Sequence, residues 1–417
     1  MSGPIRVLHV LGTLNMGGAE SRIMDLYRHI DREKVQFDFL VHYKETEEDL
    51  KNHVGTDSDS LYQRRPKDAY DEEALSYGAR IYVLPRFTGK NLGTYKKACR
   101  NFFASHHDFA VVEGHMTSMA SIYLPIAKEE GIPVTIAHAR SAGVEGGIRG
   151  AATKWFRRSL PEKCDIMMSC SRSASRSVFG KKAAESGKII LVPNALDLSS
   201  FSFDPLKRQS VRREYGIKDN VFVIGHVGRF DPVKNQVFLS RIGARLSQRE
   251  EKFCFLFVGE GKEQNAVRSA FEEAGLLDHV IFAGAQPREK TQALYQAFDA
   301  FILPSLYEGL PGTVIEAQSA GLHCLIADTI TDEVVLTNLV KQFSLDEEDS
   351  WAKELEEDIQ EEKMMKEAPL LQKEGEEERA LRSRQAIQDL TDQGYEINSF
   401  SRSMEQLYVK LAKGEQQ

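Results

Sequence analysis

Two glutamates stand out in the segment FILPSLYEGLPGTVIEAQSAGLHCLI, which covers residues 301–326. The segment reads as a short apolar strand, a Gly/Pro turn, a helix and a second strand. Glu308 precedes the turn and Glu316 lies on the helix, with seven residues between them. The packing of a strand against a helix requires neither carboxylate, so their positions indicate that they hold a ligand.

The peptide groups between the two glutamates are predicted to bind phosphate. Gly309, Leu310, Gly312 and Thr313 offer N–H groups at the start of the helix, whereas Pro311 has none. Backbone N–H groups at a helix start are free to bind an anion, and the helix dipole favours negative charge there.

The carboxylates themselves suit hydroxyl groups. A carboxylate can accept two hydrogen bonds from a vicinal diol, which sugars and riboses both have. We therefore expect Glu308 to hold sugar hydroxyls and Glu316 to hold ribose hydroxyls, on either side of the phosphate-binding peptide groups.

A second segment, GHVGRFDPVKNQVFLSRIG, places two cations beside an Asp-Pro turn between a buried strand and a helix. Arg229 can grip phosphate oxygens with two hydrogen bonds, and Lys234 adds a compact charge. Two cations at one strand end suit a diphosphate. The alternative is that they are ordinary surface residues around a loop.

A third segment, LGTLNMGGAESRIMDLYRHI, reads as strand, Gly-rich turn and helix. Gly17 and Gly18 would let the backbone approach an anion closely. The spacing is not GxGxxG, and the next strand ends in His42 and Tyr43 instead of the acid that a dinucleotide site needs. Phosphate binding and a plain tight turn both remain open for these glycines.

The elements that must position these residues alternate between strand and helix along almost the whole chain, which predicts parallel sheets with crossover helices. At 417 residues the chain suits two domains of about 200 residues each. We place the linker near residues 196–212, where Pro205 interrupts the pattern. The predicted fold is α/β, with two Rossmann-like doubly wound domains that present their strand ends to a shared cleft. The predicted strands cover residues 5–11, 37–42, 80–85, 109–115, 134–139, 165–171, 189–194, 221–228, 253–259, 280–284, 300–305 and 323–328.

Composition limits the possible environments. The net charge of −8 comes from residues 346–379, which hold fifteen acidic and five basic side chains, so the rest of the chain is close to neutral. We interpret this acidity as a solvated helical face, and nucleic acid is not an expected partner. No apolar run approaches the roughly 20 residues that cross a bilayer, and the N-terminus lacks the features of a signal peptide. We expect a cytoplasmic protein with structural thiols, including Cys254 and Cys324 in buried strands.

Together, GRFDPVKN, FVGEG and PSLYEGLPGTVIEAQSAG resemble the donor-site motifs of the GT-B glycosyltransferases, in the large retaining family with the E-x7-E motif. VTIAHARS, IMMSCSRSAS and IEAQSAGLHCLIADTITDEVVL further resemble bacterial capsular and exopolysaccharide transferases. The resemblance covers residues from about 5 to 340, and the E-x7-E block is its most specific part.

The resemblance implies an acceptor-side domain at residues 1–198, a nucleotide-sugar donor domain at 199–395 and a C-terminal helix at 396–417 that packs back toward the first domain. It implies transfer of a sugar from a nucleotide-diphosphate sugar, with a UDP-sugar as the expected donor, to a glycan or lipid-linked acceptor. The anomeric configuration would be retained, and no metal or other cofactor would be required.

Residue roles also follow from the resemblance. Arg229 and Lys234 match the pair that binds the donor diphosphate. Glu308 matches the residue that contacts the donor sugar, and Glu316 the residue that contacts the ribose. The remaining matches are Gly17 and Gly18 in the loop that closes over the phosphates, Gln286 where backbone groups contact the base, and His138 at the reaction centre.

The sequence departs from the family pattern on the acceptor side. Relatives often have HSH where this chain has EGH (residues 113–115) and HAR (residues 138–140), and Gly312 follows Pro311 where an apolar residue is more usual. His138 could instead be a core histidine at a strand end. His115 could approach the same cleft, whereas His9 is expected to be a packing residue.

Other functions remain possible from the sequence. Asp57 and Asp59 form a D-x-D pattern, as in metal-dependent transferases, but they sit in a polar loop. The Gly-rich first turn would suit a nicotinamide-dependent oxidoreductase. A non-catalytic sugar-nucleotide-binding subunit would also keep the donor residues.

One segment could contact a membrane surface. GIRGAATKWFRRSL combines Arg149, Lys154, Arg157 and Arg158 with aromatic residues, so it could lie on an anionic bilayer as a peripheral anchor. The alternative is an ordinary helix that packs its aromatic residues on the sheet.

Overall fold

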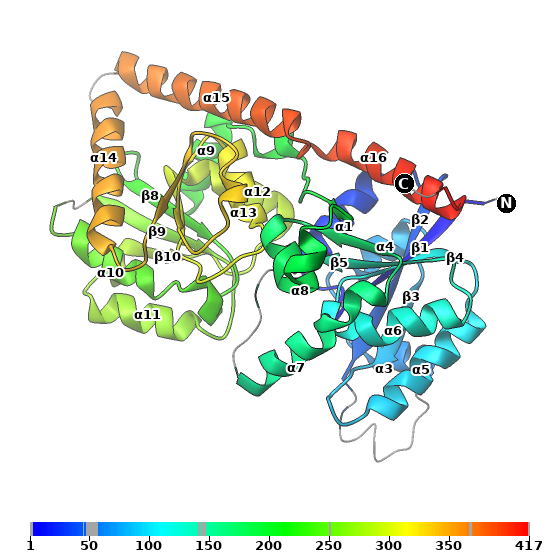
Figure 1. Cartoon of the computed structure of the whole chain (residues 1–417). Coiled ribbons are helices and arrows are strands. Elements are labelled where there is room, and N and C mark those ends of the chain that lie inside the picture. The colour runs from blue at the N-terminus through cyan, green and yellow to red at the C-terminus, as the bar shows by residue number, and fades with distance from the viewer. Residues whose placement is uncertain are drawn as a thin grey trace. The chain divides into compact units, whose positions relative to one another are not determined.

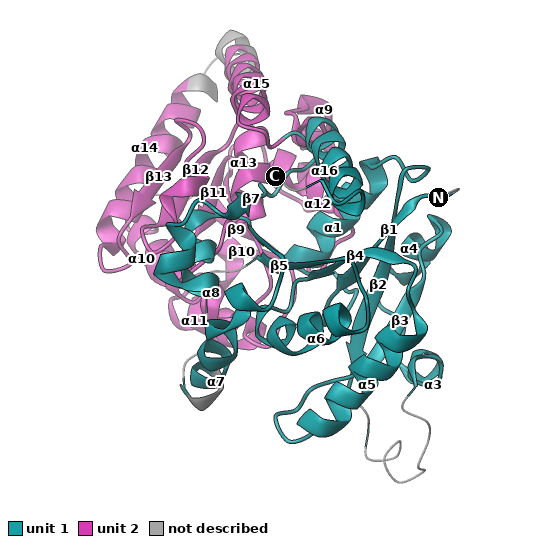
Figure 2. Ribbon diagram, turned by 45° about the vertical axis from the view of Figure 1, so that its right-hand side comes forward, with its two compact units in different colours: residues 1–196, 396–417 teal, residues 197–395 magenta. Residues whose placement is uncertain are grey.

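The computed structural model of the chain describes residues 3–44, 46, 57–140, 143, 147–249, 252–366 and 369–415. The chain divides into two compact units, coloured separately in Figure 2. Unit 1 comprises residues 1–196 and 396–417, and unit 2 comprises residues 197–395. The N-terminal and C-terminal segments therefore share one unit.

Unit 1 is built on a parallel sheet whose described strands run in the order β3-β2-β1-β4-β5-β6-β7 (Figure 1). The strand order reverses between β1 and β4, which is the hallmark of a doubly wound sheet. The strands are β1 (Ile5–Val10), β2 (Val35–Tyr43), β3 (Ile81–Pro85), β4 (Phe109–Gly114), β5 (Val134–Ala139), β6 (Ile166–Ser169) and β7 (Ile189–Leu191).

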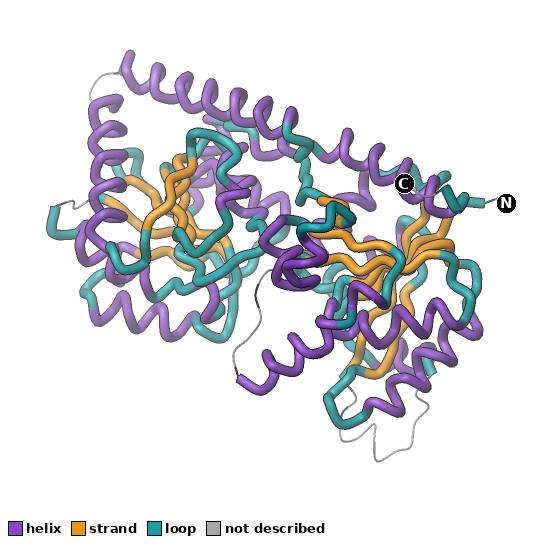
Figure 3. The backbone as a smooth tube through the Cα atoms, viewed as in Figure 1, coloured by secondary structure: helices purple, strands orange, loops and turns teal. Residues whose placement is uncertain are grey.

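Helices surround this sheet, as the purple and orange tubes of Figure 3 show. The C-terminal helix α16 is one of them, and it places Met404, Tyr408 and Leu411 in the unit 1 core. The helices of unit 1 are α1 (Gly18–His29), α3 (Ser58–Arg64), α4 (Asp71–Ser76), α5 (Leu92–Ser105), α6 (Thr117–Glu129), α7 (Gly147–Arg158), α8 (Arg172–Ala184) and α16 (Ile397–Ala412).

Unit 2 repeats the plan with the strand order β10-β9-β8-β11-β12-β13, again parallel throughout. Here the order reverses between β8 and β11. The strands are β8 (Phe222–Val227), β9 (Phe253–Val258), β10 (Val280–Phe282), β11 (Ala300–Leu303), β12 (His323–Ala327) and β13 (Val340–Phe343).

The helices of unit 2 include one short helix, α13, that follows directly on the Gly/Pro turn of the glutamate segment. The helices are α9 (Pro205–Glu214), α10 (Phe238–Leu246), α11 (Gln264–Glu273), α12 (Arg288–Ala297), α13 (Gly312–Ser319), α14 (Glu348–Lys366) and α15 (Pro369–Asp392).

The sequence pattern explains the strands. Every residue of β8, β9 and β11 is buried, as expected for central strands of a parallel sheet covered on both faces. Cys254 and Cys324 lie buried in β9 and β12, as predicted. The predicted α/β fold with two doubly wound parallel sheets is therefore confirmed. β13 was missed because its sequence, VKQF, has two exposed polar residues and carries no apolar run.

The segment where we placed the linker has regular structure. Pro205 does not interrupt the chain there: it is the first residue of α9, where a missing N–H costs nothing. The side chain of Asp204 caps this helix by accepting hydrogen bonds from the N–H groups of Leu206 and Lys207. The division between the units lies between Leu196 and Asp197, at the start of the range in which we placed the linker.

The acidic segment begins in α14, which is two-sided as predicted. Trp351 and Leu355 are fully buried, while acidic residues on the outer side pair with arginines in α10 and in the turn that follows it. Glu348 lies 3.1 Å from Arg241, and Glu356 lies 2.7 Å from Arg249. Such exposed pairs contribute little stability, so the burial of the apolar side is what fixes α14.

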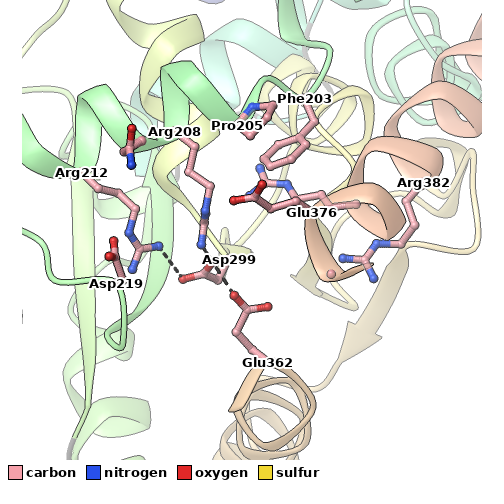
Figure 4. A pocket seen from close by; sticks show the side chains of 12 residues that line it. Phe203, Pro205, Arg208, Arg212, Asp219, Asp299, Glu362, Glu376 and Arg382 are labelled. Atoms are coloured by element: carbon pink, nitrogen blue, oxygen red, sulfur yellow. Dashed lines mark hydrogen bonds and ion pairs between the residues drawn. The ribbon is translucent and has the colours of Figure 1, made fainter. Parts of the chain in front are cut away.

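A polar pocket of about 110 Å³ in unit 2 is occupied mainly by structural interactions (Figure 4). Arg208 and Arg212 both bind the carboxylate of Asp299. Arg379, on α15, is buried and donates to the carbonyls of Tyr295, Phe298 and Ala320, which lie at the ends of α12 and α13. A cation at a helix C-terminus satisfies carbonyls that have no partner within the helix and complements its dipole.

We predict that Arg379→Met destabilises unit 2 by at least about 3 kcal/mol, because several buried carbonyls lose a charged donor. Arg384→Met, an exposed position on the same helix, should stay within about 0.5 kcal/mol of the parent. Urea unfolding followed by the fluorescence of buried Trp351, in a Trp155→Phe background, measures the difference. Equal midpoints for the two variants would show that Arg379 does not hold the helix ends.

Candidate active site

Two loops of unit 2 meet where the strand order reverses. One follows β8 and contains Arg229 and Lys234, and the other follows β11 and contains Glu308. Because β8 and β11 are parallel neighbours, both loops lie at the carboxyl edge of the sheet. The backbone N–H of Leu306 donates to the carbonyl of Val233 at 2.8 Å, which ties the loops together. A reversal point of this kind is the usual ligand position in a doubly wound sheet.

The structure brings Lys234 and Glu308 into direct contact. The Lys234 Nζ atom lies 2.5 Å from Glu308 Oε1, and the Ser305 hydroxyl donates to the same oxygen at 2.9 Å. Both charged side chains are mostly shielded from solvent, with 21% and 16% of their surface exposed. Asn235, which follows Lys234, has a left-handed backbone conformation with φ of 53°, and the turn depends on a residue that tolerates it.

Arg229 is exposed, and within the residues that the structure describes its guanidinium makes no hydrogen bond or ion pair. Its backbone carbonyl accepts from the side chain of Gln236 at 2.9 Å, which fixes the main chain of the loop. The loop is therefore anchored while the guanidinium is available to a ligand.

The start of α13 lacks an internal cap. Pro311 occupies the N-cap position and makes no side-chain hydrogen bond to the helix. The Thr313 hydroxyl is buried and has no hydrogen-bond partner among the described residues. Gly312 and Thr313 thus begin a helix whose first N–H groups are not bonded by a capping side chain, next to Leu310, which is buried.

Glu316 lies one turn further along α13 and is 7% exposed. Its Oε2 atom accepts a hydrogen bond from the Tyr295 hydroxyl at 2.9 Å, and the same hydroxyl lies 3.2 Å from the Thr313 carbonyl. Tyr295 therefore orients the second glutamate, a role that no local sequence pattern indicated.

Neighbouring loops complete this edge of the sheet. Gly259 and Gly261 of the FVGEG motif lie against the loop after β8, where an added Cβ atom would come within 2.2 Å of the carbonyl oxygens of Gly228 and Phe230. Only glycine fits at this approach. Gly259 N–H also donates to the carbonyl of Gly284, in the loop that carries Gln286. The Gln286 side chain donates to the Ala283 carbonyl, which folds it onto its own loop.

The Gly-rich loop of unit 1 lies after β1. Gly17 is the N-cap residue of α1 and has no side-chain cap, and Glu20 packs so closely over it that a Cβ atom would lie 2.3 Å from Glu20 Oε2. Gly18 has open space around the position of a side chain. Asp68 binds the backbone N–H of Leu14 at 2.7 Å and so anchors the loop.

His138 belongs to a buried polar cluster in unit 1. Its Nδ1–H donates to Glu113 Oε1 at 2.7 Å, and the Tyr408 hydroxyl of α16 donates to Glu113 Oε2 at 2.6 Å. His9 Nδ1 and His115 Nε2 are hydrogen-bonded at 3.1 Å beside them. His9 also packs edge-on against Phe37, as expected of a packing residue. His138 is fully buried, and its Nε2 atom has no partner in the described part of the chain.

Burial sets the charge states of this cluster. Desolvation lowers the pKa of His138 to about 4 and that of His9 to about 4. Burial alone would raise the pKa of Glu113, but the hydrogen bond from His138 holds it well below its usual range. An ionised Glu113 among neutral histidines is therefore the stable arrangement at neutral pH.

Three residues of this cluster lie close enough together to share a metal ion. One ligand atom each from His9, Glu113 and His115 lies within 4.8 Å of the others, as in many metal sites. The Nε atom of Arg140, however, lies 3.5 Å from His115 Nδ1. A divalent ion would share this buried space with a guanidinium, so the cluster suits a hydrogen-bond network better than a cation.

The predicted site residues fall into two groups. Arg229, Lys234, Gln286, Glu308 and the start of α13 share one edge of the unit 2 sheet, whereas Gly17, Gly18 and His138 belong to unit 1. Sequence reasoning missed Tyr295, Tyr408 and the role of Glu113. Of these, only Glu113 had a signal, as a carboxylate at the end of an apolar strand.

The D-x-D pattern has a structural role. Asp57 caps α3 by accepting hydrogen bonds from the backbone N–H and the hydroxyl of Ser60, at 2.9 and 2.7 Å. These contacts account for the first aspartate of the pattern without a metal.

Comparison with known proteins defines the class. Residues 207–372, which contain the whole unit 2 site, match the family model described as "Glycosyl transferases group 1". The chain is 34% identical over 352 residues to "Putative glycosyltransferase EpsF" of Bacillus subtilis, covering 83% of this chain and 86% of that protein. The chain therefore belongs to the group 1 glycosyltransferase family, and the resemblance drawn from its motifs is confirmed.

A more distant relative and the solved structures agree with this family. The chain is 24% identical over 245 residues to a UDP-Gal:alpha-D-GlcNAc-diphosphoundecaprenol alpha-1,3-galactosyltransferase of Escherichia coli, covering 57% of this chain and 62% of that protein. HepE of Anabaena, crystallised with UDP and glucose, superposes with a TM-score of 0.72 over 97% of this chain and 100% of its own, at 14% identity. WaaG, a glycosyltransferase involved in lipopolysaccharide biosynthesis, gives 0.68 over 96% and 99%, at 15% identity. These structures establish the GT-B fold.

The buried histidines predict that unit 1 loses stability in acid. These histidines have a pKa of about 4 in the folded state and 6.5 in the unfolded state, so between pH 4 and pH 6.5 only the unfolded state binds the proton. Each neutral histidine therefore makes its full contribution to the free energy of unfolding above pH 6.5, and this contribution declines as the pH falls toward 4. At pH 5 we expect a loss on the order of 1 to 2 kcal/mol for each such histidine. Hydrogen exchange of β4 and β5 at pH 7.5 and 5.0, corrected for the intrinsic rate, measures it.

A matched pair of variants assigns the effect. His138→Gln should weaken the dependence of the opening free energy on pH, whereas His107→Gln, at an exposed position of the same unit, should leave it unchanged. An identical pH dependence in all three proteins would mean that His138 is not held neutral.

Proposed function

We propose that the protein transfers a sugar from a UDP-sugar to a hydroxyl group of a glycan or lipid-linked acceptor, with retention of anomeric configuration, in the synthesis of a cell-surface polysaccharide. The observation that carries this proposal is the pairing of Lys234 with Glu308 beside the uncapped start of α13. Two of the matched proteins support the donor and acceptor classes. The name of the Escherichia coli relative gives UDP-galactose as donor and a lipid diphosphate as acceptor, and the HepE structure holds UDP and glucose.

The diphosphate would bind to the cations and the helix start. Arg229 offers an unpaired guanidinium, and Lys234 is held in place by Glu308 until a phosphate oxygen replaces the carboxylate as its partner. The first N–H groups of α13 add donors, and the buried Thr313 hydroxyl would add another once it is uncovered. Fixed donors around a departing phosphate stabilise the charge that develops in the transition state.

The carboxylates would hold the rest of the donor. Glu308, once released from Lys234, can accept hydrogen bonds from sugar hydroxyls. Glu316, oriented by Tyr295, can accept from the ribose. Gln286 lies on the neighbouring loop, where backbone groups would contact the base.

Unit 1 would supply the acceptor side. We assign Gly17 and Gly18 to the approach of backbone N–H groups to a phosphate, and His138 to the reaction centre. Because the His138 side chain is buried and bonded to Glu113, its contribution would be to fix the main chain at the end of β5 and, through Nε2, to bind a hydroxyl group once that atom is uncovered.

Retention without an enzymic nucleophile requires a front-face reaction. The bond between the anomeric carbon and the diphosphate oxygen breaks, and the acceptor oxygen bonds to that carbon on the same face. The acceptor proton passes to the leaving phosphate. The protein's part is to stabilise the diphosphate and to position the acceptor.

A membrane surface is the proposed setting. Of the described helices, none has an apolar stretch long enough to span a bilayer. Trp155 on α7 is 71% exposed, so this helix does not pack all its aromatic residues on the sheet. Arg157 instead turns inward and binds the Thr117 hydroxyl at 2.9 Å. We therefore propose a cytoplasmic protein that contacts the membrane peripherally, with Trp155, Lys154 and Arg158 on the outer side of α7.

Removing either cation should slow transfer. We expect Arg229→Ala and Lys234→Ala each to lower kcat/KM by a factor of roughly 10² or more, because each removes a charged donor to the leaving diphosphate. Lys218→Ala, an exposed position before β8 at the opposite edge of the sheet, serves as the control and should keep parental activity. Turnover of a UDP-sugar with unchanged melting temperature is the measurement, and parental turnover in both cation variants would refute the phosphate assignment.

Chelation should leave the reaction unaffected. The proposed phosphate partners are side chains and backbone N–H groups, so we expect the rate with EDTA to equal the rate without it. The metal content of the purified protein, measured by mass spectrometry, should show no stoichiometric ion at His9, Glu113 and His115. Loss of activity in EDTA that Mg²⁺ or Mn²⁺ restores would require a metal at the diphosphate.

A further inference from the structure

An open groove of about 580 Å³ lies in unit 1 between α5, α6 and α7, and it contains none of the residues assigned to sugar transfer. Its walls have helical spacing: Leu92, Lys96 and Arg100 are four residues apart on α5, and Ile122 and Ile126 are four apart on α6. Its volume is typical of sites that take a ligand.

The floor of the groove is apolar. Ile122 and Ile126 are buried in α6, and Pro125, between them in the sequence, is partly exposed. Phe156 of α7 closes one side and contacts the Phe87 ring edge-on at 6.0 Å. A hydrocarbon chain is the kind of group that such a floor favours.

Trp155 stands at the rim of the groove. Its ring meets the Phe156 ring edge-on at 5.0 Å, yet the residue remains 71% exposed. The hydrogen bond from Arg157 to Thr117 joins α7 to α6 and so fixes the rim against the floor. Leu92 is likewise exposed across the groove. Tryptophan at a boundary between apolar and wet surfaces is typical of the interfacial region of a bilayer.

The charges at the rim favour an anion. Lys96, Arg158 and Lys163 are exposed and, within the described chain, make no ion pair. Arg100 is paired with Glu129 at 3.0 Å. Glu162 is the acid at the rim with no cationic partner among those residues, so unpaired positive charge exceeds unpaired negative charge by two.

We propose that this groove binds one acyl chain of an anionic phospholipid at a membrane surface, with the chain on the Ile122–Ile126 floor and the phosphate among Lys96, Arg158 and Lys163. The inference rests on the peripheral membrane contact proposed above and assigns it a ligand and a place. The lysine and arginine stems can lie along the chain while their charged ends stay at the level of the phosphates.

The test uses the full chain and vesicles of phosphatidylglycerol or phosphatidylcholine. Trp351 is fully buried in unit 2, so a blue shift of the emission on vesicle addition reports Trp155. We expect the shift with phosphatidylglycerol, its quenching by lipids brominated on the acyl chain, and no shift with phosphatidylcholine or inorganic phosphate. Trp155→Phe should lose the shift but still sediment with the vesicles.

Matched variants locate the ligand. Trp155→Ser should weaken sedimentation with phosphatidylglycerol vesicles about tenfold, whereas Leu75→Ser, another exposed apolar residue of unit 1, should not. Lys96→Gln with Lys163→Gln should weaken it about 30-fold, against little change for Lys97→Gln with Lys181→Gln, which remove the same charge outside the groove.

Each other outcome refutes the proposal. If the four variants of the preceding paragraph all bind vesicles as the parent does, the protein contacts the membrane but not through the groove. Equal binding to phosphatidylglycerol and phosphatidylcholine vesicles would show that the site does not recognise an anionic headgroup. Self-association that Trp155→Ser abolishes, without vesicle binding by the parent, would assign the groove to a second copy of the chain. Since sedimentation does not depend on sugar transfer, the Arg229 and Lys234 variants test the proposed reaction separately.

Discussion

The contact between the loops after β8 and β11 is the constraint on which the unit 2 site depends. Because these strands are parallel neighbours at the reversal point, their loops must share one edge of the sheet, and the bond from Leu306 N–H to Val233 fixes their register. Lys234 and Glu308 then meet at 2.5 Å. Gly259 and Gly261 let the β9 loop close against the same place, where side chains would collide with backbone oxygens. The glycines of the FVGEG motif thus allow a close approach between loops, whereas the GRFDPVKN motif supplies charged side chains.

The sequence was sufficient for the fold wherever burial is complete. Strands such as FVIGHV and FCFLFV are buried throughout and almost wholly apolar because helices cover both faces of the sheet, and that pattern can be recognised without knowing which strands pair. β13 failed the same criterion because an edge strand is paired on one side only and can expose Lys341 and Gln342. The interpretation of Pro205 as an interruption of the pattern was wrong for a local reason. A proline breaks the interior of a helix but can begin a helix without penalty. Here only the capping residue Asp204 distinguishes the two cases.

The candidate site residues also differ in whether they could be predicted from local sequence or depend on contacts between distant parts of the chain. The residues that come from one turn, such as Glu308 and the start of α13, were predictable from spacing. The contacts of Glu113 with His138 and with Tyr408, which is 295 residues away, were not, because they depend on how α16 packs in unit 1. Tyr295 at Glu316 is a similar case. The residues that we propose as ligand contacts therefore belong to recognisable motifs, while the residues that orient them do not.

The two ends of α13 differ in how their unbonded backbone groups are satisfied. At its C-terminal end, buried Arg379 donates to the Ala320 carbonyl, so the negative pole of the helix is satisfied by protein. At its N-terminal end Pro311 supplies no side-chain cap, so no capping side chain satisfies the positive pole, which is where we propose that the diphosphate binds. A helix of eight residues packed on the sheet has little stability of its own, and a cation fixed at one end offsets the cost of leaving the other end uncapped. The arginines that line the pocket of Figure 4 have a structural role: Arg208 and Arg212 bind Asp299, and Arg379 binds the C-terminal end of α13.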